Sequence, residues 1–277
     1  MIEQLKLDIW LLGFLLLFAV SHALAAVPTL TSLTESQAET VVRDFSANFV
    51  HTSVSPASGV RGFGLELGAL AGLTQSPGIN EIVQENYGYI PHAGAIGILY
   101  LPGGFRGEYV LLPKYIYQGA SLENNSGAFA WTPTEIFAPT GFLAFRVRGF
   151  YGDGNINYSQ TVNNIPIDIY FRSFTYGGDA TLSFQNIPFV EPYFSAGIVK
   201  MDAVLRGTGS VSIFNQNYTG SKEVRIQEDA NLYAAGFVIK LPMFVAGAEY
   251  AKVADDTRIT VKLALQFSSE SAKSLHK

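Results

Sequence analysis

The stretch Thr257–Phe267, TRITVKLALQF, decides how this chain is interpreted, because its apolar and polar residues alternate strictly. One parity holds Ile259, Val261, Leu263, Leu265 and Phe267, and the other holds Arg258, Thr260, Lys262, Ala264 and Gln266. Alternate residues of an extended strand face opposite sides, so this strand has one apolar and one strongly polar face. A strand of this kind that ends in phenylalanine is typical of a transmembrane β-barrel, which is apolar outside and polar inside.

The N-terminus has the features of an export signal. Lys6 gives a weakly basic start, residues 9–20 form an apolar run, and residues 23–25 read as an A-x-A cleavage site. The run is too short to be a comfortable membrane anchor, which needs ~20 apolar residues. We therefore expect residues 1–26 to be a signal peptide that is removed on export.

Composition excludes several classes of protein. The chain has no cysteine, so a small disulfide-stapled domain is excluded. It is 48% hydrophobic and only 15% charged, yet no second apolar run long enough for a membrane-spanning helix follows Val27. The net charge is −5, and the basic residues do not gather into a stripe along the sequence. Nucleic acid is therefore not an expected partner. No residue pattern calls for a cofactor or a metal.

An amphipathic helix is predicted over residues 34–51, after a linker at 27–33. Thr34 and Gln37 have the spacing of a capping box at its start. The apolar stripe consists of Ala38, Val41, Val42, Phe45 and Phe49. Linker and helix together make a separate region over residues 27–58.

The rest of the chain, residues 59–267, is predicted to form one barrel. Ten alternating segments are expected at 61–74, 92–101, 107–118, 128–136, 142–151, 167–184, 192–206, 231–240, 244–253 and 257–267. Pro113 cannot donate to a ladder, so it predicts a bulge in the third strand. The polar parity of the sixth strand changes near Phe174, which predicts a second bulge.

The connections alternate in length, which orients the barrel. Turns after the even-numbered strands are short, whereas those at 75–91, 119–127 and 207–230 are long and polar. Short turns belong on the periplasmic side. We therefore expect both termini of the mature chain on that side, with residues 268–277 as a periplasmic tail.

These features resemble the Gram-negative outer-membrane β-barrel superfamily over Arg61–Phe267, with the strand PYFSAGIVK at 192–200 as a further match. The resemblance implies an outer-membrane location, contact with its lipid, and insertion by the barrel-assembly machinery, which reads a terminal phenylalanine. Here ten residues follow Phe267, which departs from that pattern. The helix before the barrel resembles, in architecture alone, the N-terminal hatch of FadL-type transporters.

Charged residues on the polar parities are expected to line the lumen, because a charge facing lipid is costly. They are Glu66, Glu108, Lys114, Arg146, Arg148, Lys200, Asp202, Glu249, Arg258 and Lys262. They can be a selectivity lining or a paired network that fills a narrow barrel. Arg146 and Arg148 are the best candidates for a constriction that meets anions or the helix carboxylates Glu39 and Asp44.

Glycines on the first strand suggest where the helix lies. Gly62, Gly64, Gly68 and Gly72 share the inward parity, so another backbone can approach there. We expect the stripe containing Val41, Val42, Phe45 and Phe49 to pack on this track. Easing of barrel curvature is the alternative explanation.

No catalytic site is predicted. A rim enzyme needs a histidine with a partner, and His92 lies near the outer end of a strand without a partner nearby in sequence. His51 is expected to end the helix. The leading hypothesis is a ten-stranded outer-membrane barrel, plugged or capped by the helix, that acts as a restricted channel or carrier for small molecules. The alternative is a closed structural or interaction barrel; the sequence leaves the oligomeric state open.

Overall fold

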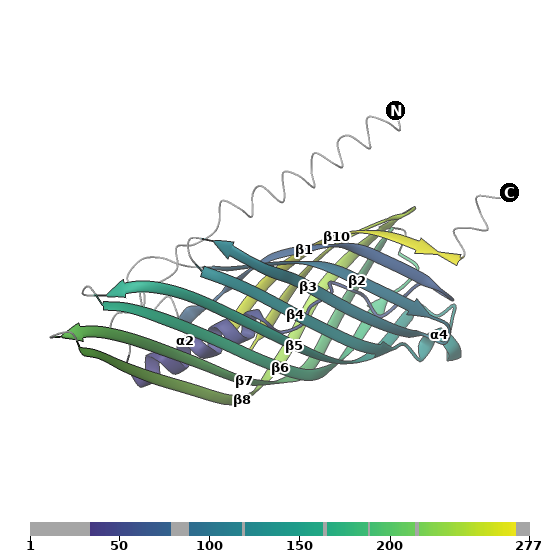
Figure 1. Cartoon of the computed structure of the whole chain (residues 1–277). Helices are drawn as coiled ribbons and strands as arrows, with labels where there is room; N and C mark the ends of the chain where they lie inside the picture. The colour runs from purple at the N-terminus through teal and green to yellow at the C-terminus, as the bar shows by residue number, and fades with distance from the viewer. Residues whose placement is uncertain are drawn as a thin grey trace.

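The computed structural model describes residues 34–78, 89–117, 120–162, 165–187, 189–213 and 216–269. The predicted signal peptide, the linker, most of the 75–91 loop and most of the tail lie outside these residues. Ten antiparallel strands close into one barrel in sequence order, with β1 paired to β10 (Figure 1). The predicted all-β barrel of ten strands is therefore confirmed.

The elements in chain order are α2 (Glu35–Asn48), β1 (Gly64–Gln75), β2 (Ile90–Leu101), β3 (Phe105–Tyr117), β4 (Ala120–Trp131), α4 (Thr134–Phe137), β5 (Leu143–Val162), β6 (Ile165–Phe184), β7 (Val190–Ile213), β8 (Gln216–Leu241), β9 (Phe244–Val253) and β10 (Asp256–Ser268). The capping box between Thr34 and Gln37 is present at the start of α2. Of the described helices, none is long and apolar enough to cross a bilayer.

The outer wall of the barrel is an exposed apolar band. Leu67, Phe129, Phe194, Ile198 and Ile259 are each at least half exposed. Inside, the alternating residues are buried, and they include charged side chains such as Glu66, Arg146 and Lys262 as well as apolar ones such as Ile98. A closed antiparallel barrel with this outer band is the architecture of an outer-membrane protein, because closure leaves no strand edge in the hydrocarbon.

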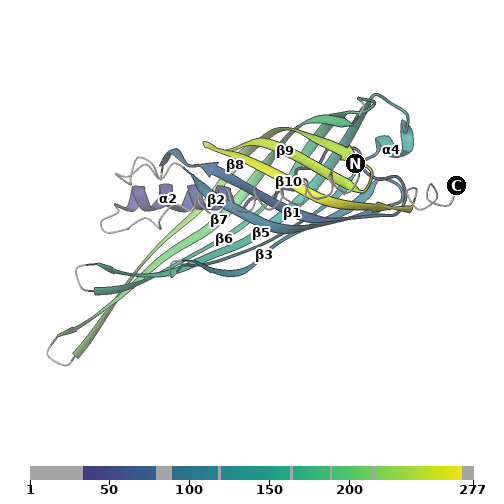
Figure 2. The same ribbon diagram turned by 90° about the horizontal axis from the view of Figure 1, so that it is seen from above.

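Strands β5 to β8 are the longest of the barrel, and residues 121–125 of β4 pair with the lower part of their projecting section. β5 to β8 continue beyond β9 and β10 as a tilted sheet, and α2 lies beside its inner surface (Figures 1 and 2). We call the part of this sheet beyond the apolar band the extension; it contains residues 153–172 of β5 and β6 and residues 200–231 of β7 and β8. Counted together with these strand residues beyond the apolar band, the connections are long at the extension end and short at the opposite end. Because long connections of such barrels are extracellular and short ones periplasmic, we assign the extension to the outside and the opposite end to the periplasm.

Two predicted loops are strands in the structure. Residues 120–127 belong to β4, and most of the predicted loop 207–230 belongs to β7 and β8. Both were predicted as loops because they are polar. Conversely, the predicted fourth strand at 128–136 is wrong at its end, where Thr134–Phe137 forms the short helix α4.

Of the two predicted bulges, one is present and one is absent. The β3–β4 register shifts between Leu112 and Tyr115, as Pro113 predicted. Around Phe174, β6 pairs without interruption with both β5 and β7. The change of polar parity therefore has another cause, which is a change of surroundings along the strand. Residues of β6 before Phe174 belong to the extension, where the inner side of the sheet faces α2 and the outer side faces water. Residues after Phe174 belong to the membrane section, where the inner side is polar and the outer side faces lipid.

Candidate functional site: the plugged lumen and its periplasmic mouth

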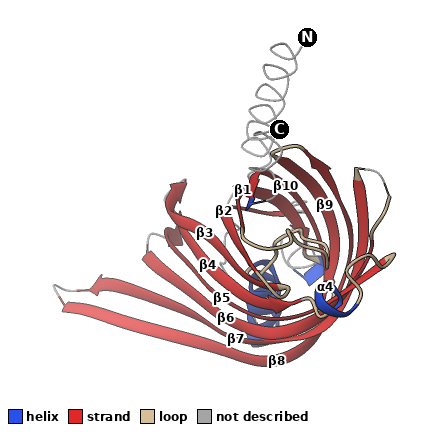
Figure 3. Cartoon of the chain, turned by 90° about the vertical axis from the view of Figure 1, so that its right-hand side faces the viewer, coloured by secondary structure: helices blue, strands red, loops and turns tan. Residues whose placement is uncertain are grey.

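Residues 49–58, which we call the plug segment, run through the lumen from α2 to the periplasmic mouth (Figure 3). His51, Val54 and Ala57 are at most 1% exposed. At membrane depth the lumen is thus filled by this irregular segment, whereas α2 lies above it against the extension. The prediction that the helix itself packs at the β1 glycines is therefore wrong.

Side chains of the wall satisfy the backbone of the plug segment. Arg258 donates to the Val50 carbonyl at 2.7 Å, and Arg146 donates to that of Pro56 at 3.1 Å. Arg106 donates to the carbonyls of Pro56 and Ala57 at 2.9 and 3.2 Å. Buried carbonyls without a partner are costly, and a guanidinium has five donors. These arginines therefore bind the plug segment rather than an open aqueous path.

A buried ionic network, which we call the lumen network, surrounds Glu108. Arg148 Nη1 lies 3.1 Å from Glu108 Oε2, and Arg106 and Arg146 lie 3.6 and 3.7 Å from Oε1. Asp179 adds a second carboxylate 2.6 Å from Arg148. Three guanidinium groups thus share two carboxylates, which is the pairing that buried charges require.

Two residues of the plug segment join this network. His51 contacts Glu108 at 3.1 Å and Ser126 at 2.9 Å, and Ser53 accepts a hydrogen bond from Arg148 at 2.9 Å. The prediction that His51 merely ends the helix is wrong, since α2 ends at Asn48 and His51 lies inside the barrel.

Smaller polar groups hold the remainder of the lumen. Glu66 pairs with Lys262 at 2.7 Å and accepts from Tyr100 at 2.9 Å. Glu249 accepts hydrogen bonds from Thr52 of the plug segment and from Tyr193, both at 2.8 Å.

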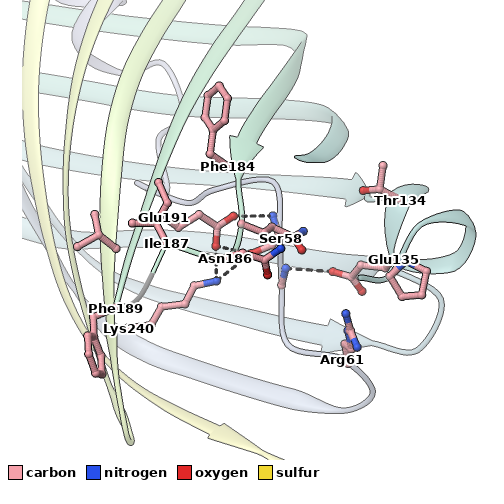
Figure 4. Close-up of a pocket in the computed structure, with 14 residues that line it drawn as sticks. Ser58, Arg61, Thr134, Glu135, Phe184, Asn186, Ile187, Phe189, Glu191 and Lys240 are labelled. Carbon is pink, nitrogen blue, oxygen red and sulfur yellow. Dashed lines mark hydrogen bonds and ion pairs between the residues drawn. The ribbon is translucent and has the colours of Figure 1, made fainter. Parts of the chain in front are cut away.

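At the periplasmic mouth, a cavity of about 270 Å³ opens beside the end of the plug segment (Figure 4). Glu191 binds Ser58 and Lys240 there, the latter at 2.6 Å. The amide of Gly59 donates to Glu135 of α4 at 3.0 Å. Burial raises the pKa of Glu135 above its usual value, although the bond from Gly59 opposes this. The mouth therefore carries charges of both signs.

At the other end, α2 shares an apolar core with the extension. Val42 is fully buried beside Leu205 and Val224, and the ring of Phe49 stacks on Phe171 with centroids 6.0 Å apart. Val41 is also buried, and Phe45 packs at the edge of the same cluster. This core gives the extension an apolar inner surface although it stands outside the membrane.

Seven of the ten predicted lumen charges lie inside the barrel: Glu66, Glu108, Arg146, Arg148, Glu249, Arg258 and Lys262. Lys114, Lys200 and Asp202 do not, so their predicted placement is wrong. Lys114 lies within the β3 bulge and is exposed. Lys200 and Asp202 lie on the outer surface of the extension, paired with Asp229 and Arg225. The contact of Arg146 or Arg148 with Glu39 or Asp44 is not among the described ion pairs.

The close backbone approach occurs on β5, not on β1. A Cβ at Gly152 would lie 2.5 Å from the Phe49 carbonyl oxygen, whereas a Cβ at Gly68 or Gly72 would meet neighbouring strands. A glycine does admit another backbone to the wall, as predicted for β1, but it does so on β5. Gly152 lies just beyond the predicted fifth strand, which ends at Tyr151.

Sequence reasoning also missed Arg106 and Asp179. Arg106 shares the parity of Glu108 on β3, but the predicted strand began one residue later. Asp179 lies inside the predicted sixth strand, on its polar parity, and was left out of the predicted lumen charges. An earlier start of the third strand would have revealed Arg106, and the parity rule applied to the sixth strand would have revealed Asp179.

No catalytic constellation is evident around His92. Its Nε2 lies 2.9 Å from Thr260 Oγ1, and its Nδ1 has no hydrogen-bond partner in the described part of the chain. An acid that would orient the ring, as a nucleophile–base pair requires, is thus missing from these residues. Nor do the described residues gather three or more metal-ligating side chains.

Comparison with known proteins gives architecture alone. No family model and no curated protein matches the chain. Similar solved structures include Ail, the attachment invasion locus protein of Yersinia pestis (16% identity, 75% of this chain and 99% of that chain, TM-score 0.31). Others are the N-terminal barrel of Pseudomonas aeruginosa OprF (12%, 76% and 100%, TM-score 0.32) and the NalP translocator domain of Neisseria meningitidis (8%, 84% and 95%, TM-score 0.38). None of these likenesses transfers a residue role or an activity to this chain.

Proposed function

We propose that this outer-membrane barrel is closed by its own plug segment and presents the extension to other macromolecules. The observation that carries the proposal is the burial of residues 49–58, which Arg106, Arg146, Arg148 and Arg258 all bind. A second cavity, beside Ser55 and Pro56, has about 10 Å³, too little for more than one water. A lumen filled in this way does not favour the passage of solutes through the barrel.

The extension supports an interaction role because it is a folded surface rather than a set of loops. β7 and β8 pair from Val190↔Ile239 to Ile213↔Gln216 without a register shift. Its outer charges form ion pairs across strands, such as Arg172–Asp153 and Arg206–Glu223. A surface with its own core, standing clear of the lipid, is pre-ordered for binding.

A restricted channel is the second candidate, and the polar character of the plug contacts favours it. Hydrogen bonds from arginines can be exchanged for water when the segment moves, and the cavity beside Ser58 already admits solvent-sized molecules. In this function the lumen network would become a lining for anionic or mixed-charge solutes.

Planar-bilayer recordings separate the two candidates. Wild-type protein and a variant that lacks α2 and the plug segment, residues 34–58, are compared, with heat-modifiable gel mobility as the control for folding. The closed barrel predicts no conductance steps in wild type and steps in the deletion variant. Steps in wild type that respond to solute size would favour the channel and contradict the proposal.

Presentation of the extension is tested independently of conductance. An epitope inserted at the β7–β8 turn, between residues 213 and 216, should be labelled by antibody on intact cells. A matched epitope in the β8–β9 turn, at Pro242 and Met243, should be labelled only after permeabilisation. The reverse pattern would overturn the assigned orientation.

A further inference from the structure

Among the described residues, one side of β8 has no partner strand in the extension. β9 pairs with β8 from Leu241↔Phe244 to Leu232↔Val253 and then ends. β8 continues for residues 216–231, which pair with β7 on one side and with no described strand on the other. Figures 1 and 2 show this hairpin projecting past the ends of β9 and β10.

The hydrogen-bonding groups that point to this open side can be identified. The amide of Ala254 donates to the Asn231 carbonyl at 3.1 Å, so the backbone of Asn231 faces away from β7. Backbone groups alternate sides along a strand. Glu223, Arg225, Gln227 and Asp229 therefore direct both N–H and C=O to the open edge, while their side chains lie exposed on the outer surface.

This edge lacks two of the usual protections against pairing, proline and a β-bulge. Residues 216–231 contain no proline, and their register with β7 contains no bulge. The charged side chains of this edge have partners within the molecule. Glu223, Arg225 and Asp229 pair with Arg206, Asp202 and Lys200 of β7. Glu228 and Lys222 pair with Arg43 and Glu35 of α2. What remains for a partner is a row of backbone donors and acceptors that no described strand pairs with.

We infer that the open edge of β8 binds an extended amphipathic segment of another protein by strand addition, which rests on the interaction role proposed above. Strand addition satisfies the backbone groups of this edge and continues the sheet. The added strand places apolar side chains on the inner surface, in line with Val224 and Ile226, and polar ones on the outer surface. β7 has this pattern, with Met201, Ala203 and Leu205 buried and Lys200 and Arg206 exposed.

A second copy in the same membrane does not fit this edge. Strands of a barrel are tilted, so a twofold axis along the membrane normal makes two β8 strands cross instead of lying side by side. The occupant is therefore a strand that can approach from outside the membrane plane.

The test uses the full mature chain in detergent and a fluorescent peptide with the sequence Ile198–Gly209 of β7 as the probe. Gln227→Pro removes one edge-facing amide without removing a bond to β7, and Gln227→Ala is the matched control. Loss of edge hydrogen bonds should weaken peptide binding about tenfold in the proline variant and leave it unchanged in the alanine variant. A peptide with alternate N-methylated amides should not bind.

Arg225→Pro is the second variant, in case Gln227→Pro fails the heat-modifiability control. Absence of binding to wild type, equal binding of the methylated peptide, or binding unaffected by both proline variants would each overturn the inference. Concentration-dependent dimers that the peptide cannot displace would instead assign the edge to a second copy and overturn it also. The peptide-binding assay does not measure conductance. A negative result would therefore overturn strand addition without deciding whether the barrel is closed.

Discussion

The membrane section and the extension share the same strands but have opposite polarity. On β7, Phe194 and Ile198 face outward into the apolar band, and Ser195 faces inward. A few residues further along the strand, Lys200 faces outward and Leu205 faces inward. Pairing with β6 continues across the boundary without a shift. Polarity is therefore set by what lies on each side of the sheet, not by the strand itself.

The two interiors are also stabilised differently. In the membrane section, charged side chains bind an irregular segment whose backbone needs partners. In the extension, α2 satisfies its own backbone, so no wall side chain has to bind its carbonyls. It is held by apolar contact with β6 to β8 and by the ion pair between Arg43 and Glu228 at 2.7 Å. An irregular plug thus requires arginines that bind its backbone, and a helical one does not.

The sharpest test of this difference is removal of Glu108. Glu108→Ala leaves Arg106, Arg146 and Arg148 with one carboxylate, and breaking a buried ionic network costs about 3–5 kcal/mol. The free energy of unfolding in urea, measured on protein folded into lipid vesicles, should fall by that amount.

Glu223→Ala is the matched variant in the extension, where the ion pair with Arg206 is half exposed. Its effect should be below about 1 kcal/mol. Equal losses in the two variants would show that the lumen network is not more important to stability than a surface pair.

The fold was more predictable than the plug. Ten strands, the even count and the Pro113 bulge follow from alternation and turns, which are local properties of sequence. β5, β7 and β8 were predicted too short because their outer residues above the band are polar, such as Arg206 and Glu223. Apolar and polar residues still alternate there, but the polar residues face outward instead of inward. The sequence of a single strand does not show which of its two sides α2 covers.

The candidate site was predictable only in part. Arg146, Arg148 and Arg258 were placed in the lumen by parity alone, whereas their contacts with the plug segment depend on its path. That path is long-range: Val50 meets Arg258 across most of the sequence. The Gly152 contact depends on the same path and could not be read from the strand.

A second test places an arginine on the outer surface of each region. Phe194→Arg faces lipid, and an arginine on a lipid-facing barrel position costs about 2–4 kcal/mol at the bilayer midplane. Val204→Arg stands on the outer surface of the extension, where water is the neighbour, and should change stability little. Urea unfolding in vesicles measures both. If Val204→Arg is as costly as Phe194→Arg, the extension is embedded in lipid and the inversion of polarity has been misassigned.

The smallest expected effect arises at the boundary, where the plug segment crosses from α2 into the lumen. Gly152→Ala places a methyl group 2.5 Å from the Phe49 carbonyl oxygen, and a backbone atom cannot swing away as a side chain tip can. Overpacking of this kind costs about 1–3 kcal/mol, and here it can be relieved by displacing the plug segment. Gly207→Ala in the extension is the control, because nothing lies within 4 Å of its added methyl group. We expect Gly152→Ala alone to raise protease cleavage within residues 49–58 in intact vesicles, scored by mass spectrometry. Equal protection of both variants from protease would contradict this expectation. It would mean that the plug segment accommodates the methyl group at Phe49, where the two regions join, so the contact with Gly152 does not hold the segment in place.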